Sequence, residues 1–215
     1  MQSSISFAGL QLTFLAEKAL WCAELGAMFI ADVHFGKAAH FRKSGIPIPE
    51  PIHDQDLLQL EKLITTFQPV DFYILGDLFH SDWNDQWQKL NDFLERFPQT
   101  TFHLIKGNHD ILPHSFYRQS IFQIHDKPLL IHELLLSHEP LEQVPEEKLN
   151  ICGHIHPGFR IRGKAKQNLF LACFYYKKRQ LILPAFGHFT GLAMVKASGD
   201  DRIFGISGKK VIQIL

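Results

Sequence analysis

Five polar clusters in the chain contain side chains that bind metals or transfer protons, and each cluster directly follows a run of apolar residues. Ligands of parallel sheets collect beyond the carboxyl ends of the strands, so this placement predicts that the clusters meet at one edge of a sheet. The clusters are Asp32-Val33-His34, Gly76-Asp77, Gly107-Asn108-His109-Asp110, Ser137-His138-Glu139-Pro140 and Gly153-His154-Ile155-His156.

The spacing inside two of the clusters predicts which side chains converge. Residues two apart in an extended chain point to the same side. We therefore expect Asp32 to converge with His34, and His154 with His156, while the residue between each pair turns toward the apolar interior.

The pooled donors are carboxylate, amide and imidazole groups without a thiolate, a set that suits Mn²⁺, Fe or Zn²⁺. The set is too large for one ion, whereas two ions that share a carboxylate would use it fully. Each residue alone is also compatible with a turn or capping role. Cys152, two positions before His154, leaves a mixed Cys/His zinc site open, but its segment reads as a core strand. The candidate metal ligands are Asp32, His34, Asp77, Asn108, His138, His154 and His156.

The first half of the chain alternates strand and helix signals. Apolar residues recur at helical spacing over 57–67, with Asp54 as the candidate N-cap, and again over 87–97. Strands are predicted at 10–15, 19–22, 27–31, 70–75 and 101–105. Strands that alternate with helices of this length indicate a parallel sheet and the α/β fold class.

The second half contains short apolar runs, most of them separated by turn residues, and no long helical pattern. This pattern predicts a mostly antiparallel second sheet packed against the first. The runs lie at 121–124, 129–136, 149–152, 169–175, 180–183, 192–195, 202–206 and 211–215. No linker or long repeat interrupts the sequence, so we expect one domain over residues 1–215.

Composition narrows the class of protein. The 215 residues are 46% hydrophobic and 20% charged, which is typical of a globular chain with a substantial core, and the formal net charge of zero gives no global attraction to nucleic acid. Three cysteines without close spacing favour a reducing compartment. The absence of a bilayer-length apolar stretch and of a signal-peptide pattern predicts a cytoplasmic protein without a membrane partner.

The five clusters, in this order, resemble the signature of the calcineurin-like metallophosphoesterases. A narrower resemblance joins ADVHFGKAAHFRKSGIPIPE (31–50), LGDLFHS (75–81), LSHEP (136–140) and LPAFGHFTG (183–191) to the bacterial DNA ligase-associated metallophosphoesterases. One departure is Leu192, which follows Gly191 where we expect a second glycine. The resemblance implies a metallo-dependent phosphatase fold, a four-layer α/β/β/α sandwich with two mixed β-sheets.

The resemblance also implies roles for the site residues. One metal would be bound by Asp32, His34, Asp77 and His156, and the other by Asp77, Asn108, His138 and His154, so that Asp77 bridges. His109 would be the general acid for the leaving group. Asp110 would orient or tune His109, or would cap the loop. The two divalent ions are expected to be Mn²⁺, with Fe or Zn²⁺ as alternatives.

The narrower resemblance implies a Mn²⁺-dependent phosphoesterase that acts on DNA and is associated with a ligase, a helicase and a nuclease in DNA repair. Basic and aromatic segments beside the metal centre suit single-stranded DNA, so we expect a single-strand endonuclease. Arg42, Lys43 and Arg160 are candidates to hold backbone phosphates, with Phe159 as the aromatic beside Arg160 and His80 as a further substrate contact. The alternative for the basic segment after His156 is a solvated hairpin.

Two other functions remain open at this point. The same metal centre would serve a phosphomonoesterase, a cyclic nucleotide phosphodiesterase or a nucleotide pyrophosphatase. A non-catalytic interaction module on this fold is the third hypothesis, and the complete set of candidate ligands argues against it.

Overall fold

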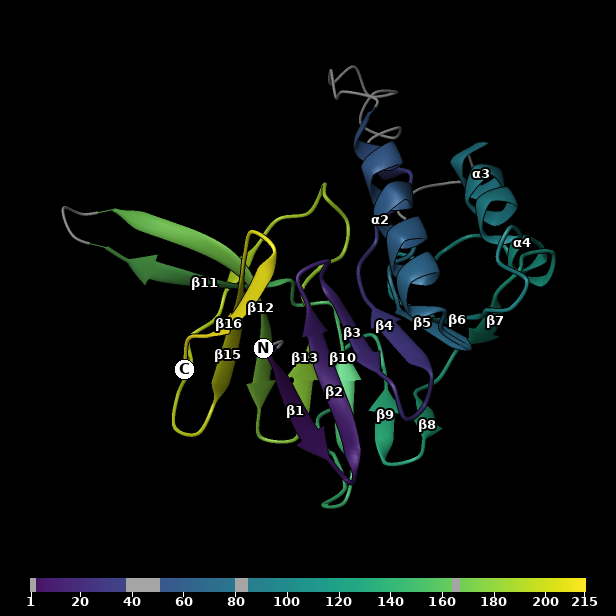
Figure 1. Cartoon of the computed structure of the whole chain (residues 1–215). Helices are drawn as coiled ribbons and strands as arrows, with labels where there is room; N and C mark the ends of the chain where they lie inside the picture. The colour runs from purple at the N-terminus through teal and green to yellow at the C-terminus, as the bar shows by residue number, and fades with distance from the viewer. Residues whose placement is uncertain (1–2, 38–50, 80–84, 164–166) are drawn as a thin grey trace.

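The computed structural model describes residues 3–37, 51–79, 85–163 and 167–215 (Figure 1). For residues 51–54 only the backbone is described. Three of the predicted substrate contacts, Arg42, Lys43 and His80, lie outside the described residues. None of the described helices is long and apolar enough to cross a membrane.

The first sheet has seven strands in the order β1-β2-β3-β4-β5-β6-β7. The strands are β1 (Ser4–Phe7), β2 (Leu10–Leu15), β3 (Ala19–Cys22), β4 (Ala27–Ile30), β5 (Asp71–Leu75), β6 (Thr101–Ile105) and β7 (Gln123–His125). Pairing is antiparallel from β1 to β4 and parallel from β4 to β7. The predicted parallel pairing is confirmed for β4 to β7, whereas the predicted strands at 10–15 and 19–22 pair antiparallel, so this sheet is mixed. The run at 121–124 joins this sheet and not the second one.

Three helices cover one face of the first sheet: α2 (Pro51–Phe67), α3 (Asp85–Leu94) and α4 (His114–Arg118). Their apolar side chains, among them Leu60, Trp87 and Tyr117, share one buried cluster with that face. Helix α2 begins at Pro51, so Asp54 lies inside the helix and its prediction as the N-cap is wrong; proline is well tolerated in a first turn because its missing N–H is not needed there. Helix α4 is too short to show helical periodicity in the sequence.

The second sheet has nine strands, in the order β14-β11-β12-β13-β10-β9-β8, with β15 paired to β12 and β16 to β15. The strands are β8 (Leu129–Ile131), β9 (Leu134–Leu136), β10 (Leu149–Cys152), β11 (Pro157–Arg162), β12 (Asn168–Lys177), β13 (Gln180–Ile182), β14 (Ala193–Met194), β15 (Arg202–Ser207) and β16 (Lys210–Gln213). Most pairs are antiparallel, as predicted, but β10 is parallel to both of its neighbours. The sheet is thus mixed.

The two sheets pack face to face through an aromatic core. Phe14 of the first sheet lies 4.7 Å from Phe174 and 4.4 Å from Phe204 of the second, measured between ring centroids. The outer face of the second sheet carries a smaller buried cluster around Cys173 and Tyr175, which Val195 packs against. The α/β class with two mixed sheets is confirmed. Among the described residues, no helix covers that outer face, so three of the four expected layers are present there.

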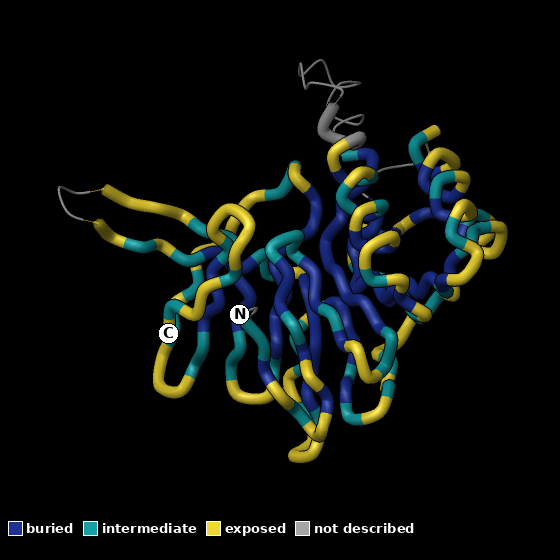
Figure 2. Tube along the Cα trace, in the orientation of Figure 1, coloured by how far each residue is buried: buried dark blue, intermediate teal, exposed yellow. Residues whose placement is uncertain are grey.

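Strands β11 and β12 extend beyond the body of the second sheet as a hairpin (Figure 1, left). Most of the hairpin is exposed or half-buried, whereas the strands in the body of the two sheets are more deeply buried (Figure 2).

Candidate metal centre

The parallel pairing of both sheets brings the polar clusters to one edge. Strands β4, β5 and β6 run in the same direction and in register, so the segments that follow Ile30, Leu75 and Ile105 leave the sheet side by side. Strands β9 and β10 are likewise parallel. The carboxyl ends of five strands therefore deliver all the candidate ligands, as expected for a site beyond the ends of parallel strands.

Hydrogen bonds lock these segments together. The backbone N–H of His34 donates to the carbonyl of Asp77 (2.8 Å), and Gly153 N–H donates to the carbonyl of His138 (2.9 Å). The N–H of His154 donates to Oδ2 of Asp32 (2.9 Å), which joins the second sheet to the first across the site.

The ligand positions do not have the extended backbone that the sequence spacing suggested. Asp32, His34, Asp77, His154 and His156 all have positive φ, between 50° and 66°. L-residues adopt this left-handed region at a cost, and such residues concentrate at functional sites where the surroundings enforce the conformation. Asp32 and His34 converge as expected, whereas His154 approaches His138 and His156 approaches Asp32, and isolated left-handed residues, not an extended strand, carry these side chains.

One group of side chains consists of Asp32, His34 and His156. The Nε2 atoms of His34 and His156 lie 3.3 Å apart, and Nε2 of His156 lies 3.3 Å from Oδ1 of Asp32. Asp32 is completely buried and His34 nearly so. These three residues place ligand atoms close enough together to hold one ion.

The second group surrounds Nε2 of His138. This atom lies 3.0 Å from Oδ1 of Asn108, 3.1 Å from Nδ1 of His154 and 3.5 Å from Oδ1 of Asp77. The other ring nitrogen of His138 donates to the carbonyl of Leu75 (3.0 Å), because a carbonyl can only accept. In the neutral ring, Nε2 then presents a lone pair that faces the lone pairs of Asn108 Oδ1 and Asp77 Oδ1, an arrangement that a cation stabilises.

Asp77 lies between the two groups. Its Oδ1 faces His138 (3.5 Å) and its Oδ2 faces Nε2 of His34 (3.9 Å). Asp32 also approaches His138, but at Nδ1 (3.9 Å), the nitrogen already used by the Leu75 carbonyl. Ligand atoms of Asp32, Asp77 and His138 also lie close enough together to hold an ion, so both carboxylates reach the second group. Asp77 is the one whose two oxygens face different groups, as a bridging ligand requires.

Two glycines allow the ligands to approach the backbone. A Cβ at Gly107 would overlap the carboxylate and N–H of Asp77, and one at Gly153 would overlap the carboxylate of Asp32. Both overlaps are far inside contact distance, so neither position accommodates a larger residue without displacement of a candidate ligand. The donor set and these close approaches fit a site for two divalent cations.

His109 and Asp110 have different surroundings. The ring of His109 is exposed, with its centroid 5.8 Å from that of His34, and its backbone N–H donates to Oδ1 of Asp77 (2.9 Å). Asp110 is buried and accepts hydrogen bonds from the N–H groups of Leu78, Phe79 and Gly107, at 2.8–3.2 Å. Burial raises the pKa of the Asp110 carboxyl to about 6, although the N–H groups of Gly107 and Phe79 oppose the shift. Of the two roles expected for Asp110, these contacts favour the cap.

Other candidates lie outside the ligand groups. Arg160 is exposed on β11, four residues after His156. Cys152 is buried in the apolar cluster on the outer face of the second sheet and belongs to neither ligand group. All three cysteines are free. Sequence reasoning did not single out Asp56, whose Oδ1 lies 2.6 Å from Nδ1 of His188; their wide separation in the chain gave no signal of this pair.

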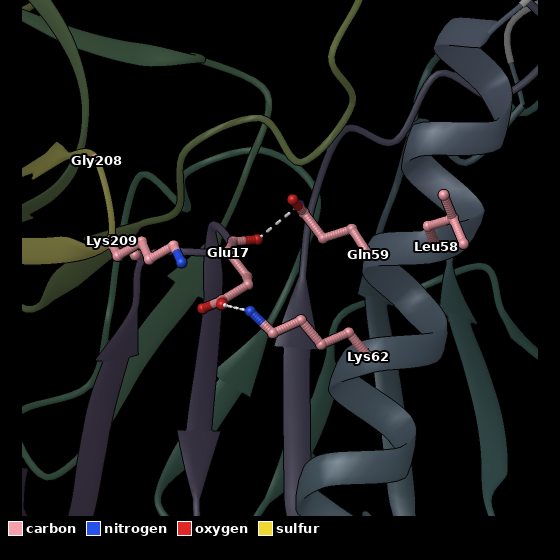
Figure 3. A pocket seen from close by; sticks show the side chains of 7 residues that line it. Glu17, Leu58, Gln59, Lys62, Gly208 and Lys209 are labelled. Atoms are coloured by element: carbon pink, nitrogen blue, oxygen red, sulfur yellow. Dashed lines mark hydrogen bonds and ion pairs between the residues drawn. The ribbon is translucent and has the colours of Figure 1, made fainter.

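A cavity of about 320 Å³ lies elsewhere, between the turn after β2, helix α2 and the turn between β15 and β16 (Figure 3). Its main charged groups already interact, since Nζ of Lys62 lies 2.6 Å from Oε1 of Glu17. None of its lining residues is a candidate ligand. The chemistry therefore concentrates at the strand ends and not in this cavity.

The fold and the donor set define a metal-dependent hydrolase of phosphate esters, and comparison with known proteins agrees. The chain belongs to the calcineurin-like phosphoesterase family, whose model matches residues 27–143, a segment that contains five of the seven candidate ligands. The family resemblance is thus confirmed.

Among solved structures, the chain is similar to nuclease MPE of Pseudomonas putida, with a TM-score of 0.80 and 27% sequence identity over 100% of both chains. The description of that protein as a nuclease agrees with the narrower resemblance. A phosphoesterase of E. coli, Yfce, matches with a TM-score of 0.44 and 15% identity over 87% of this chain and 97% of that chain. A search of curated proteins found no match.

Proposed function

We propose that this chain is a dinuclear phosphodiesterase that cuts single-stranded DNA. The observation that carries the proposal is the convergence of seven carboxylate, amide and imidazole ligands at the ends of five strands, with Asp77 between two groups. The similarity to a nuclease supports DNA as the substrate. A role in DNA repair beside a ligase, a helicase and a nuclease, in the cytoplasm, is part of the same proposal.

The proposed ligand allocation follows the two groups. Asp32, His34, Asp77 and His156 would hold one cation, and Asp77, Asn108, His138 and His154 the other. When bound, two divalent cations would lower the pKa of water and neutralise the phosphoryl oxygens. Mn²⁺ is the proposed metal, because oxygen and imidazole donors suit it, and Fe and Zn²⁺ accept similar donors.

The protein side chains perform the remaining steps. Asn108 is a neutral oxygen donor, so it adds a ligand without reducing the positive charge at the site. His109 is exposed beside the two groups and would donate a proton from its ring to the leaving oxygen of the cleaved diester. Asp110 would hold the loop that carries Asn108 and His109 in place through its three backbone hydrogen bonds.

The first experiment tests the reaction class and the substrate. Purified protein loaded with Mn²⁺ is assayed on a single-stranded DNA oligonucleotide, on bis-p-nitrophenyl phosphate and on p-nitrophenyl phosphate. We expect cleavage of both diesters and slower turnover of the monoester. Failure to hydrolyse any of the three with Mn²⁺ would refute the proposal, and a preference for the monoester would favour a phosphomonoesterase.

The second experiment tests the role of His109. Removal of a general acid slows departure of a poor leaving group far more than that of p-nitrophenolate, which needs no proton near neutral pH. We expect His109→Ala to lower kcat for DNA by about 10²–10⁴-fold and to affect bis-p-nitrophenyl phosphate much less. Equal losses on both substrates would contradict this assignment and indicate a role in the metal centre.

A further inference from the structure

One face of the β11–β12 hairpin combines basic and aromatic side chains that are far apart in the sequence. In an antiparallel pair, residues directly opposite each other project to the same face. Arg160 is opposite Phe170 and Arg162 is opposite Asn168. Because residues two apart in a strand share a face, Arg160, Arg162 and Phe170 lie together. We call these three residues the arginine–phenylalanine face.

The aromatic residue of this face is not the one expected from the sequence. Phe159 is adjacent to Arg160 in the chain and therefore projects to the opposite face, where it packs against the cluster around Cys173 and Tyr175. Phe170 is 52% exposed and makes no ring contact with another described aromatic residue. A large aromatic ring that is exposed opposite Arg160 and diagonal to Arg162 is available to stack on an unpaired base.

The positive charge of the face is not neutralised locally. Arg160 and Arg162 are both exposed, and neither forms an ion pair with any residue in the described ranges. The wider segment from residue 148 to residue 199 contains nine Lys and Arg and no Asp or Glu, although the whole chain has zero net charge. This segment, which contains strands β10 to β14 and the hairpin, thus concentrates positive charge that the total conceals, which suits a polyanion.

The strand that carries the two arginines leaves directly from the candidate metal centre. Strand β11 starts at Pro157, immediately after His156, and the N–H of Ala193 in β14 donates to the carbonyl of His156 (2.9 Å). Leu192 and Met194 lie over Gly158 on this same face and are 41% and 42% exposed. Partly exposed apolar side chains therefore lie beside Gly158, between the metal ligand and Arg160 in the chain.

Distances along the strand suit a chain-like substrate. At about 3.3 Å per residue, Arg160 lies roughly 13 Å and Arg162 roughly 20 Å along the chain from His156. These distances exceed the reach of a single nucleotide bound at the metals. A pocket of about 290 Å³ on the hairpin is lined by Arg160, Arg162, Gly163, Gln167 and Asn168, so the surface is hollowed where the arginines stand.

We propose that the arginine–phenylalanine face is a subsite for single-stranded nucleic acid, several nucleotides from the phosphate that is cut. Arg160 and Arg162 bind backbone phosphates, and Phe170, across the hairpin from Arg160, stacks on a neighbouring base. The proposal rests on the proposed nuclease function and adds to it the place where the uncut part of the strand binds.

The test compares a long and a short substrate. The double variant Arg160→Gln/Arg162→Gln and the single variant Phe170→Leu are assayed with Mn²⁺ on a 20-nucleotide single strand and on bis-p-nitrophenyl phosphate, which is too small to reach the hairpin. The matched control is Lys177→Gln/Lys178→Gln, which removes the same charge at the opposite end of β12, about 25 Å from Phe170 by strand rise.

We expect kcat/KM for the oligonucleotide to fall about ten- to a hundredfold in the arginine variant and about tenfold in Phe170→Leu, mainly through KM. Turnover of the small diester should be unchanged in both, and the lysine control should retain wild-type kinetics on both substrates. The slope of log(kcat/KM) against log salt for the oligonucleotide should become less steep by about 1.4 in the arginine variant, because each phosphate contact to a single strand contributes about 0.7.

Three outcomes would overturn the subsite. Equal loss on both substrates would mean that the variants disturb the metal centre, and equal loss in the lysine control would reduce the effect to non-specific charge. Unchanged cleavage of the oligonucleotide would assign the face to another partner, such as a protein. If the wild-type protein hydrolyses the small diester but not DNA, the nuclease function itself fails, and that failure is recognised before any variant is made.

Discussion

The metal centre and the arginine–phenylalanine face are neighbours in the chain, joined at His156 and Pro157, yet they are built in opposite ways. In the metal centre, Asp32, His34, Asp77 and His138 are buried, and backbone hydrogen bonds fix the segments that carry them. On the hairpin face, the side chains are exposed and the arginines are without a described ion partner.

The difference follows from what each region must do. Charge stabilisation in a reaction requires ligands that do not reorganise, and burial among packed strands supplies that rigidity. A flexible polyanion requires accessible charge and an aromatic surface, which an exposed hairpin supplies. Changes in the metal centre should therefore affect every substrate and also stability, whereas changes on the face should affect only long substrates.

The largest effect is expected from His138→Ala, which removes a ligand from the centre of the second group. We expect turnover of bis-p-nitrophenyl phosphate to fall by about a thousandfold or more, because one cation site is lost. Bound Mn²⁺, measured by elemental analysis, should fall toward one ion per chain. The control His114→Ala changes an exposed histidine of α4 and should retain both activity and metal. Full metal content in His138→Ala would contradict the ligand assignment.

The second-largest effect is expected on the free energy of unfolding, when the buried carboxylate of Asp110 beside the metal centre is removed. Asp110→Ala leaves three backbone N–H groups without their buried acceptor, and we expect the free energy of unfolding to fall by about 3 kcal/mol, measured by urea denaturation. Asp110→Asn keeps one acceptor oxygen and should lose less. Asp126→Ala, which removes an exposed carboxylate near Lys106, should be almost neutral. Wild-type stability in Asp110→Ala together with lost catalysis would favour the orienting role.

Bound Mn²⁺ should stabilise the fold through the proposed metal ligands. Because the proposed ligands come together only in the folded chain, Mn²⁺ at a hundred times its dissociation constant should raise the free energy of unfolding by about 2.7 kcal/mol for each site. Thermal denaturation of chelated and Mn²⁺-loaded protein measures this change. His138→Ala should lose part of the gain, while Arg160→Gln/Arg162→Gln should show all of it. Equal gains in both variants would break the distinction between the two regions.

The smallest effect separates two phenylalanines of one hairpin. Phe159 packs into the cluster on the outer face of the second sheet, so Phe159→Leu should lower the free energy of unfolding by about 1 kcal/mol. Phe170→Leu should leave stability within about 0.5 kcal/mol, since Phe170 is half exposed. Urea denaturation of both variants measures the contrast. A larger loss from Phe170→Leu than from Phe159→Leu would show that Phe170 has a structural role.

Much of the fold was evident from the sequence, and the errors have physical causes. Continuous apolar runs located β4, β5 and β6, because strands buried on both faces contain little else. The run at 121–124 was placed in the wrong sheet, since a three-residue strand carries no information about its partner. Strand β11 was missed as a strand because its apolar residues alternate with arginines and it follows a metal ligand without a turn.

The sequence by itself determined which chemistry is available. Carboxylates, an asparagine and histidines that follow apolar runs, in an order typical of a phosphoesterase family, specify an oxygen and nitrogen site for divalent cations. Composition and spacing are properties of neighbouring residues, so these conclusions needed no structure.

Only the tertiary structure decided how those residues meet. The ligands meet through left-handed backbone at five ligand positions and through hydrogen bonds between segments far apart in the chain. The register of β11 and β12 pairs Arg160 with Phe170, ten residues away, while the adjacent Phe159 packs against the cluster on the outer face of the second sheet. Both results depend on which strands pair and in what register, and long-range pairing is not encoded in any local pattern.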